Sequence, residues 1–134
     1  MYVNLTQDLT VLESISDAAQ RNSMALRLAE TRHPDVVPVL LRLIERPDLI
    51  NARATLIHCL GYYKLADHFD LLVDLVATGN WEAAHEAHGL LSSIEELSGD
   101  QIGNAFNVIG RLVRAGAAEK WRQDLLQDLL SMFE

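Results

Sequence analysis

The chain has 134 residues, of which 49% are hydrophobic and 22% charged, and its formal net charge is −8 at pH 7. This length suits one compact domain rather than two, and the apolar content is sufficient for a buried core. The acidic balance disfavours nucleic acids and anionic membrane surfaces as partners, because both are bound by clustered lysine and arginine.

The single cysteine and the N-terminal residues indicate a reducing, cytoplasmic location. Cys59 lies in the apolar run ATLIHCL and has no second cysteine to pair with, so we expect it in the core. The start MYVNLTQDLT has no basic stretch followed by a long apolar one, and no segment approaches the roughly 18 apolar residues of a membrane span. We therefore expect a cytoplasmic protein.

Apolar residues are spaced three and four apart throughout, which predicts an all-α fold of about eight helices with short connections. In chain order we expect helices over about 5–18, 22–31, 36–46, 48–63, 66–79, 81–97, 98–116 and 118–133. Asp35, Asp48 and Asn80 are the expected N-caps of the third, fourth and sixth helices, and Gly79 should close the fifth.

Helix pairs recur along the chain. The run DVVPVLLRLI from Asp35 aligns with DHFDLLVDLV from Asp67 at an offset of 32, and NARATLIHCL aligns with EAAHEAHGLL at an offset of 31. Two leucine-rich helices can also match by chance, which leaves a non-repeating helical fold open. Short connections predict that sequential helices pack antiparallel, as in helical repeat proteins.

These runs resemble the HEAT repeat family, in particular the short bacterial type also found in phycobilin lyases. Arg53, Leu60 and Gly61 stand where the family usually has arginine, leucine and glycine. Residues 34–64 fit the repeat, and residues 65–97 fit it except that Ser92 replaces the glycine. The resemblance implies a right-handed superhelix of αα-hairpins in a single domain, 1–134, with pairs 5–32 and 100–133 as caps. It implies a binding scaffold and no particular activity.

The last two helices carry the only local cluster of basic residues. It is interleaved with acidic side chains, so we expect no binding of nucleic acid; its members are Arg111, Arg114, Lys120 and Arg122. An apolar stripe on the last helix is expected to face the core, and it consists of Trp121, Leu125, Leu129 and Phe133.

The segment from Leu65 to Asp100 carries a charge of −8 and has no lysine or arginine. Part of it forms an acidic band, in which one stripe lies on the fifth helix and one pair on the sixth: Asp67, Asp70, Asp74, Glu82 and Glu86. Such a band, in a segment without lysine or arginine, favours a basic protein partner. An acidic protein with unevenly distributed charge would show the same pattern.

The stretch NWEAAHEAHGLL places Trp81, His85 and His88 on a polar arc beside the apolar face of the sixth helix, so these histidines are not expected in the core. The corresponding stripe one repeat earlier consists of Asn51, Thr55, His58 and Tyr62. The second helices line the concave side in solenoids that resemble this chain. The two stripes are therefore expected to form one shallow polar groove.

A metal site is the alternative for the same helix. His85 and Glu86 resemble one of the HE pairs that hold two irons in deoxyhypusine hydroxylase, a HEAT-repeat enzyme, but a single pair supplies too few ligands. His85 and His88 could instead share a metal with Glu82 and a distant ligand such as His68. The preferred interpretation needs no metal and no cofactor.

The sequence predicts a non-enzymatic protein-protein interaction module that binds a basic protein, with no small-molecule substrate evident. An immunity protein that blocks a nuclease-type toxin would have this profile, because carboxylates speed association and occupy the site meant for phosphates. Two alternatives stay open. One is a small metal-dependent or lyase-like HEAT enzyme centred on His85, Glu86 and His88, and the other is an adaptor subunit of a larger assembly.

Overall fold

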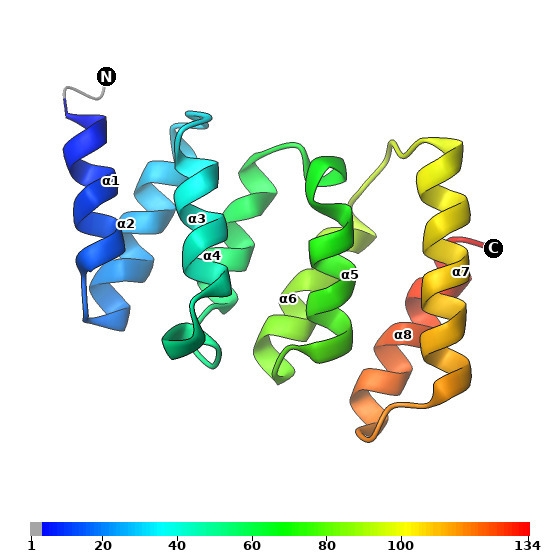
Figure 1. Cartoon of the computed structure of the whole chain (residues 1–134). Helices are drawn as coiled ribbons and strands as arrows, with labels where there is room; N and C mark the ends of the chain where they lie inside the picture. The colour runs from blue at the N-terminus through cyan, green and yellow to red at the C-terminus, as the bar shows by residue number, and fades with distance from the viewer. Residues whose placement is uncertain (1–3) are drawn as a thin grey trace. The chain divides into compact units, whose positions relative to one another are not determined.

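The computed structural model describes residues 4–134, and in this range all regular structure is helical (Figure 1). One compact unit ends at Tyr63 and contains α1 (Leu5–Ser14), α2 (Ala18–Glu30), α3 (Val36–Glu45) and α4 (Ala54–Cys59). A second unit, Lys64–Glu134, contains α5 (Phe69–Thr78), α6 (Trp81–Ser92), α7 (Gly99–Ala115) and α8 (Lys120–Met132). Three short 3₁₀ turns are η1 (Pro47–Leu49), η2 (Leu60–Tyr62) and η3 (Leu65–His68).

The eight α-helices of residues 4–134 pack in consecutive pairs, which confirms the predicted all-α array of helical hairpins. The boundaries of a single domain and a right-handed superhelix stay predictions.

The first unit has a core of aliphatic side chains in which α2 packs against α3 and α4, and α1 packs against α3. Its fully buried large side chains are Leu12, Leu28, Leu40, Leu43, Ile44, Leu56, Ile57 and Leu60. Cys59 is buried among them, as predicted. Burying one such side chain contributes about 1.5–3 kcal/mol, so this layer supplies most of the unit's stabilisation.

In the second unit, α5 packs closely against α6 because α6 presents alanine to it. Ala83, Ala84 and Ala87 are fully buried. Gly79 closes α5 as predicted, and the close approach requires glycine there. A Cβ at this position would lie 2.6 Å from the carbonyl oxygen of Leu75 and 3.1 Å from the Cβ of Ala83.

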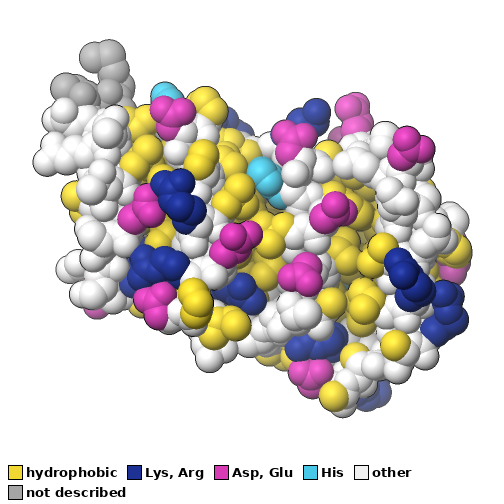
Figure 2. Space-filling view, in the orientation of Figure 1, with side chains coloured by type: hydrophobic (Ala, Val, Ile, Leu, Met, Phe, Trp, Pro, Cys, Tyr) yellow, Lys and Arg dark blue, Asp and Glu magenta, His cyan; other side chains and the backbone are white. Residues whose placement is uncertain are grey.

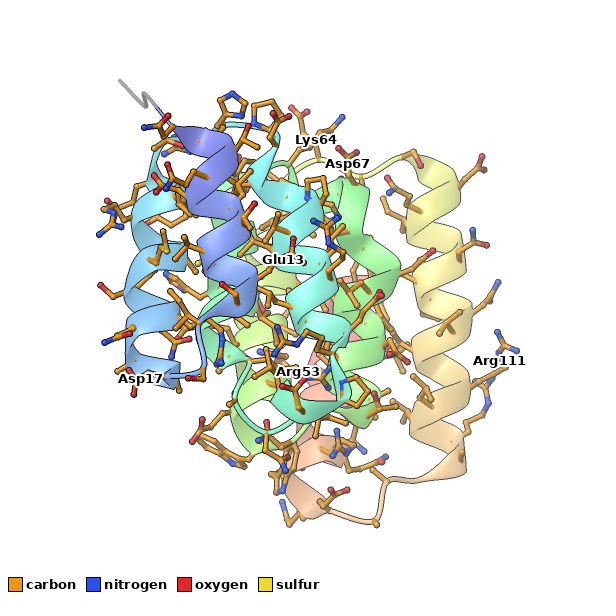
Figure 3. The ribbon with its side chains drawn as sticks, turned by 60° about the vertical axis from the view of Figure 1, so that its left-hand side comes forward. Glu13, Asp17, Arg53, Lys64, Asp67 and Arg111 are labelled. Carbon is orange, nitrogen blue, oxygen red and sulfur yellow. The ribbon has the colours of Figure 1, made fainter. Side chains whose placement is uncertain are left out.

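Two arginines, Arg21, which is buried, and Arg53, which is half-buried, bind backbone carbonyls at the ends of the first helices of the pairs. Arg21 donates to the carbonyl of Ile15 (2.9 Å) after α1, and Arg53, labelled in Figure 3, donates to that of Ile44 (2.9 Å) in α3. The last carbonyls of a helix have no partner within the helix, and a cation there also interacts favourably with the helix dipole. These contacts tie the two helices of each hairpin together.

In α5 the same role falls to Arg122 of α8, which donates to the carbonyls of Val76 (2.7 Å) and Gly79 (2.8 Å). Its guanidinium also binds the carboxylate of Glu119 (2.9 Å), and this hydrogen bond lowers the pKa of Glu119. Arg122 is only 8% exposed, so it differs from the other three basic residues of this part of the sequence, which are exposed. Arg122 is a structural residue of the second unit.

Several predicted helix ends were wrong because local side chains set different boundaries. Asp17 caps α2 by accepting a hydrogen bond from the backbone of Gln20 (2.9 Å), so α1 ends earlier and α2 begins earlier than expected. Asp48 does not cap α4, because α4 begins only at Ala54 and ends at Cys59, well inside the predicted 48–63; Asp48 lies in η1, and Arg46 binds its carboxylate (2.8 Å). Asp35 stands at the N-cap of α3, but its side chain makes no capping hydrogen bond.

Two further predictions need correction, one on the end of a helix and one on a buried helix face. α6 ends at Ser92 rather than near residue 97, whereas Asn80 caps its start as predicted by accepting from the backbone of Ala83 (2.9 Å). On α8 Leu129 is buried as predicted, whereas Trp121, Leu125 and Phe133 of the predicted stripe are half-buried, and Arg122 and Leu126 are buried beside them.

Candidate functional site

Three carboxylates line the exposed part of the α5 region. Asp67 lies in η3, and Asp70 and Asp74 lie on α5; all three are exposed. Within residues 4–134 none of the three forms an ion pair. Thr78 donates to the backbone carbonyl of Asp74 (2.9 Å) and leaves its carboxylate uncompensated. The three residues are thus exposed and without an ion pair, but only Asp70 and Asp74 lie on α5 as predicted, since Asp67 precedes the helix.

Some carboxylates of the acidic segment, including one of these three, also have a structural role. Asp70, Glu82 and Asp100 each lie in the first turn of a helix, where a negative charge stabilises the helix dipole. Glu86 is half-buried on α6, whereas Glu95 and Glu96 are exposed in the connection before α7. Asp74 lies in the middle of α5, where the helix dipole does not stabilise a negative charge. It is therefore the carboxylate that folding explains least.

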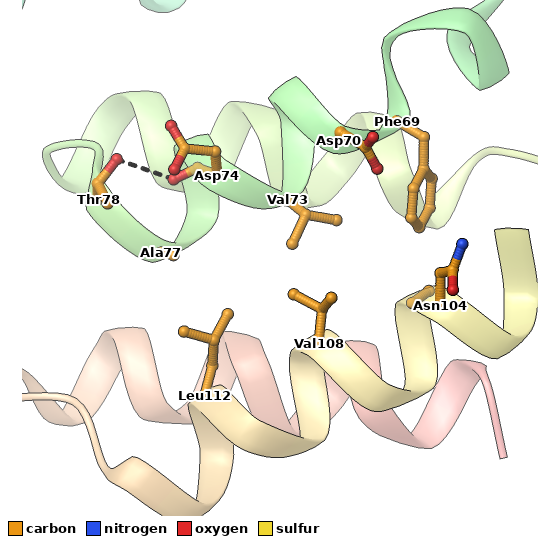
Figure 4. Close-up of a pocket in the computed structure, with 10 residues that line it drawn as sticks. Phe69, Asp70, Val73, Asp74, Ala77, Thr78, Asn104, Val108 and Leu112 are labelled. Carbon is orange, nitrogen blue, oxygen red and sulfur yellow. Dashed lines mark hydrogen bonds between the residues drawn. The ribbon is translucent and has the colours of Figure 1, made fainter.

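A groove runs between α5 and α7 beside these carboxylates (Figure 4). It has a volume of about 520 Å³ and is lined by Phe69, Asp70, Val73, Asp74, Ala77, Thr78, Asn104, Ala105, Val108 and Leu112. Figure 4 shows Val73 of α5 opposite Val108 of α7. Figure 2 shows hydrophobic side chains exposed between these helices and acidic ones over α5. Helical spacing in the sequence does not predict this groove.

The polar arc of α6 exists, and aromatic stacking organises its first half. The rings of Trp81 and His85 stack with centroids 3.9 Å apart, and the ring of Trp121 on α8 lies 5.5 Å from that of His85. His85 Nδ1 donates to the carbonyl of Trp81 (2.7 Å), which fixes the ring. Trp81 is 55% exposed, so this cluster presents one open aromatic face.

His88 is held separately from His85. Its Nε2 donates to the Asp128 carboxylate on α8 (2.7 Å). In the described part of the chain, no three histidine, cysteine, aspartate or glutamate side chains are arranged to hold a metal ion. His85 and His88 therefore contact different neighbours, a tryptophan and an aspartate, rather than a shared centre.

The predicted stripe in the first unit is only partly helical. Asn51 is exposed in a turn before α4, Thr55 and Tyr62 are half-buried, and His58 is exposed. Its main neighbour was missed: the guanidinium of Arg32 lies 5.5 Å from the centre of the Tyr62 ring and donates to the Tyr62 carbonyl (3.2 Å). Arg32 follows α2 with a φ of 59°, so helical spacing gave no signal for it. The continuous groove across both stripes stays a prediction.

The family of the chain follows from comparison with known proteins. Residues 9–91, more than half of the chain, match the family described as HEAT repeats. The chain therefore belongs to the HEAT repeat family, and its repeats form a scaffold of the kind used in protein-protein interaction. No curated protein and no solved structure matches the chain. Among the residues described, no helix is long and apolar enough to cross a membrane.

Proposed function

We propose that this HEAT-repeat protein binds a basic protein through the exposed carboxylates of the α5 region and acts by blocking its partner rather than by catalysis. The observation that supports this proposal most strongly is that Asp67, Asp70 and Asp74 are all exposed and make no ion pair within residues 4–134. They lie in a segment, 65–100, that contains no lysine or arginine.

Repulsion between two of these carboxylates favours the binding of a cation from a partner. Asp70 and Asp74 lie one helical turn apart, and like charges at this spacing cost a helix about 0.2–0.5 kcal/mol. A bound lysine or arginine would remove this repulsion. Uncompensated charge also steers an oppositely charged partner and raises the association rate by roughly 10- to 1000-fold at low ionic strength.

A nucleic-acid-binding partner, such as a nuclease-type toxin, fits this surface well. Such a protein must present lysine and arginine to phosphates, and the carboxylates of α5 would occupy those side chains in competition with nucleic acid. Exposed Trp81 on α6 offers a flat aromatic face to the same kind of cationic side chain.

Affinity capture from the source organism, followed by mass spectrometry, tests the proposal. The wild-type chain should capture a basic protein at low salt and release it at high salt, because exposed charge pairs are screened. The variant D67K/D70K/D74K should not capture it. Retention of the same protein by this variant, or capture that salt does not affect, would overturn the proposal.

A further inference from the structure

We propose that the groove between α5 and α7 is the docking site for an amphipathic helix with a basic edge and an apolar face. This inference rests on the proposed function and deepens it, since it states where the basic partner binds and which kind of segment it inserts. The groove is lined by both helices and has a volume of about 520 Å³.

The floor of the groove is apolar and open. Phe69 and Val73 of α5 and Ala105 of α7 are nearly buried at its bottom, whereas Val108 is 38% exposed. Figure 4 shows the valine side chains of the two helices pointing toward each other across it. An apolar side chain placed here would remove this surface from water, at about 25 cal/mol for each Å² buried.

The groove lies where α5 and α7 run side by side without packing closely against each other. α7 packs against α8, and α8 packs against α5 and α6, so α8 fixes both walls. The smallest side chains that line the groove are Ala77 of α5 and Ala105 of α7. The walls therefore hold the groove open without a ligand.

In the first unit, the neighbouring helices α1 and α3 are joined by an ion pair that the α5–α7 groove lacks. There α1 packs directly on α3, and Arg42 of α3 donates two hydrogen bonds to the Glu13 carboxylate of α1 (2.6 and 3.1 Å). Along the α5–α7 groove, Asp70 and Asp74 supply carboxylates, but no lysine or arginine lines it. A basic residue from a partner would supply the cation that Arg42 supplies to Glu13.

The shape and chemistry of the walls favour a helix over an extended peptide. Both walls are helices, whose backbone groups bond within the helix, so an extended segment would find no backbone partners there. The lining residues of α5 run from Phe69 to Thr78, about 14 Å at 1.5 Å per residue. Lysines four residues apart on a docked helix would match the spacing of Asp70 and Asp74.

The family match does not by itself predict this groove. The α5 wall lies within the matched residues 9–91, whereas all of α7 lies after them. The groove forms at the junction between the last matched hairpin and the final helix pair of this chain.

The test uses a defined probe, a fluorescein-labelled peptide of about 14 residues with leucine at positions i, i+3, i+4 and i+7 and lysine elsewhere. A scrambled peptide of the same composition lacks the apolar face, and a third peptide has glutamate in place of lysine. Fluorescence anisotropy at fixed salt gives each Kd. The wild-type protein should bind the first peptide at least about tenfold more tightly than either control, a difference of about 1.4 kcal/mol.

Matched variants locate the binding. D70K/D74K changes the groove, and E95K/E96K makes the same change in net charge at exposed residues that do not line it. V108D changes the floor, and F106D makes the same change at a residue of α7 that is 42% exposed and outside the groove. D70K/D74K and V108D should each weaken binding at least about tenfold, and the two controls less than about twofold. V108D adds a negative charge, so charge repulsion cannot explain its loss of a basic peptide.

Circular dichroism of each variant checks that it is folded. Equal weakening by D70K/D74K and E95K/E96K, with V108D unchanged, would overturn the groove and leave binding by general acidic charge. Failure of the wild-type protein to bind the amphipathic peptide, while it still captures a basic protein from the organism, would likewise remove the groove and keep the proposed function. Binding of the peptide in the groove without capture of any basic protein would overturn the proposed function alone.

Discussion

Replacing Arg122 with alanine should destabilise the second unit more than any single surface substitution. The guanidinium is 8% exposed and donates to the carbonyls of Val76 and Gly79 at 2.7 and 2.8 Å. Leaving a buried acceptor without its partner costs about 1–3 kcal/mol, and loss of a cation at a helix C-terminus costs about 0.3–1 kcal/mol more. Allowing for partial entry of water, we expect a loss of about 3 kcal/mol in the free energy of unfolding.

Urea denaturation measures this loss. The only two tryptophans, Trp81 and Trp121, lie in the second unit, so their fluorescence reports on it directly. Because Trp121 lies under the Arg122 guanidinium, which is 4.5 Å from the ring centre, circular dichroism should accompany the fluorescence. The midpoint should fall with little change in slope, as expected when stability changes and the exposed surface does not.

Two further variants control the interpretation. Arg122→Lys should lose most of the same stability, because an ammonium group on a flexible chain cannot donate to two carbonyls and a carboxylate in the fixed geometry of a guanidinium. Arg111→Ala, at an exposed arginine of α7 labelled in Figure 3, should change stability by less than about 0.5 kcal/mol. If Arg122→Ala unfolds at the same urea concentration as Arg111→Ala, the structural role of Arg122 is refuted.

Three other outcomes are expected. Gly79→Ala should destabilise the second unit by about 1–3 kcal/mol, because its Cβ would stand 2.6 Å from a carbonyl oxygen of α5; wild-type stability in urea would contradict this. Asn80→Ala should cost about 1 kcal/mol through loss of the α6 cap, while Asn80→Asp should keep most of it. Arg42 hydrogen-bonds to Glu13 and lowers its pKa, so the stabilisation is present above the ordinary glutamate pKa and lost as pH falls through the lowered value. Carboxyl NMR titration should show the pKa of Glu13 rise in Arg42→Ala, and an unchanged value would contradict the pairing.

Local patterns in the sequence were sufficient for the helical architecture. Apolar spacing gave the helices and their pairing, and the helical wheel correctly left His85 and His88 outside the core. The caps were predictable only in part. Asn80 caps α6, but Asp48 binds Arg46, two residues before it, instead of a helix end.

Features that depend on distant residues were not predictable in this way. Arg122 looks like a surface residue in sequence because the carbonyls that bind it lie 43 and 46 residues earlier. His88 hydrogen-bonds to Asp128, which lies 40 residues later in the chain. The groove depends on how far α8 holds α7 from α5, which no local pattern contains. The acidic stripe was visible in sequence, and the structure adds the apolar floor beside it.

The most direct test of the central claim is quantitative capture of partner proteins by the wild-type chain and by D67K/D70K/D74K, side by side at low salt. The claim predicts that a basic protein is captured by the wild type and is lost from the variant, while the two chains show the same circular dichroism. Equal capture of that protein by the two folded chains would contradict the claim that the carboxylates of the α5 region bind the partner.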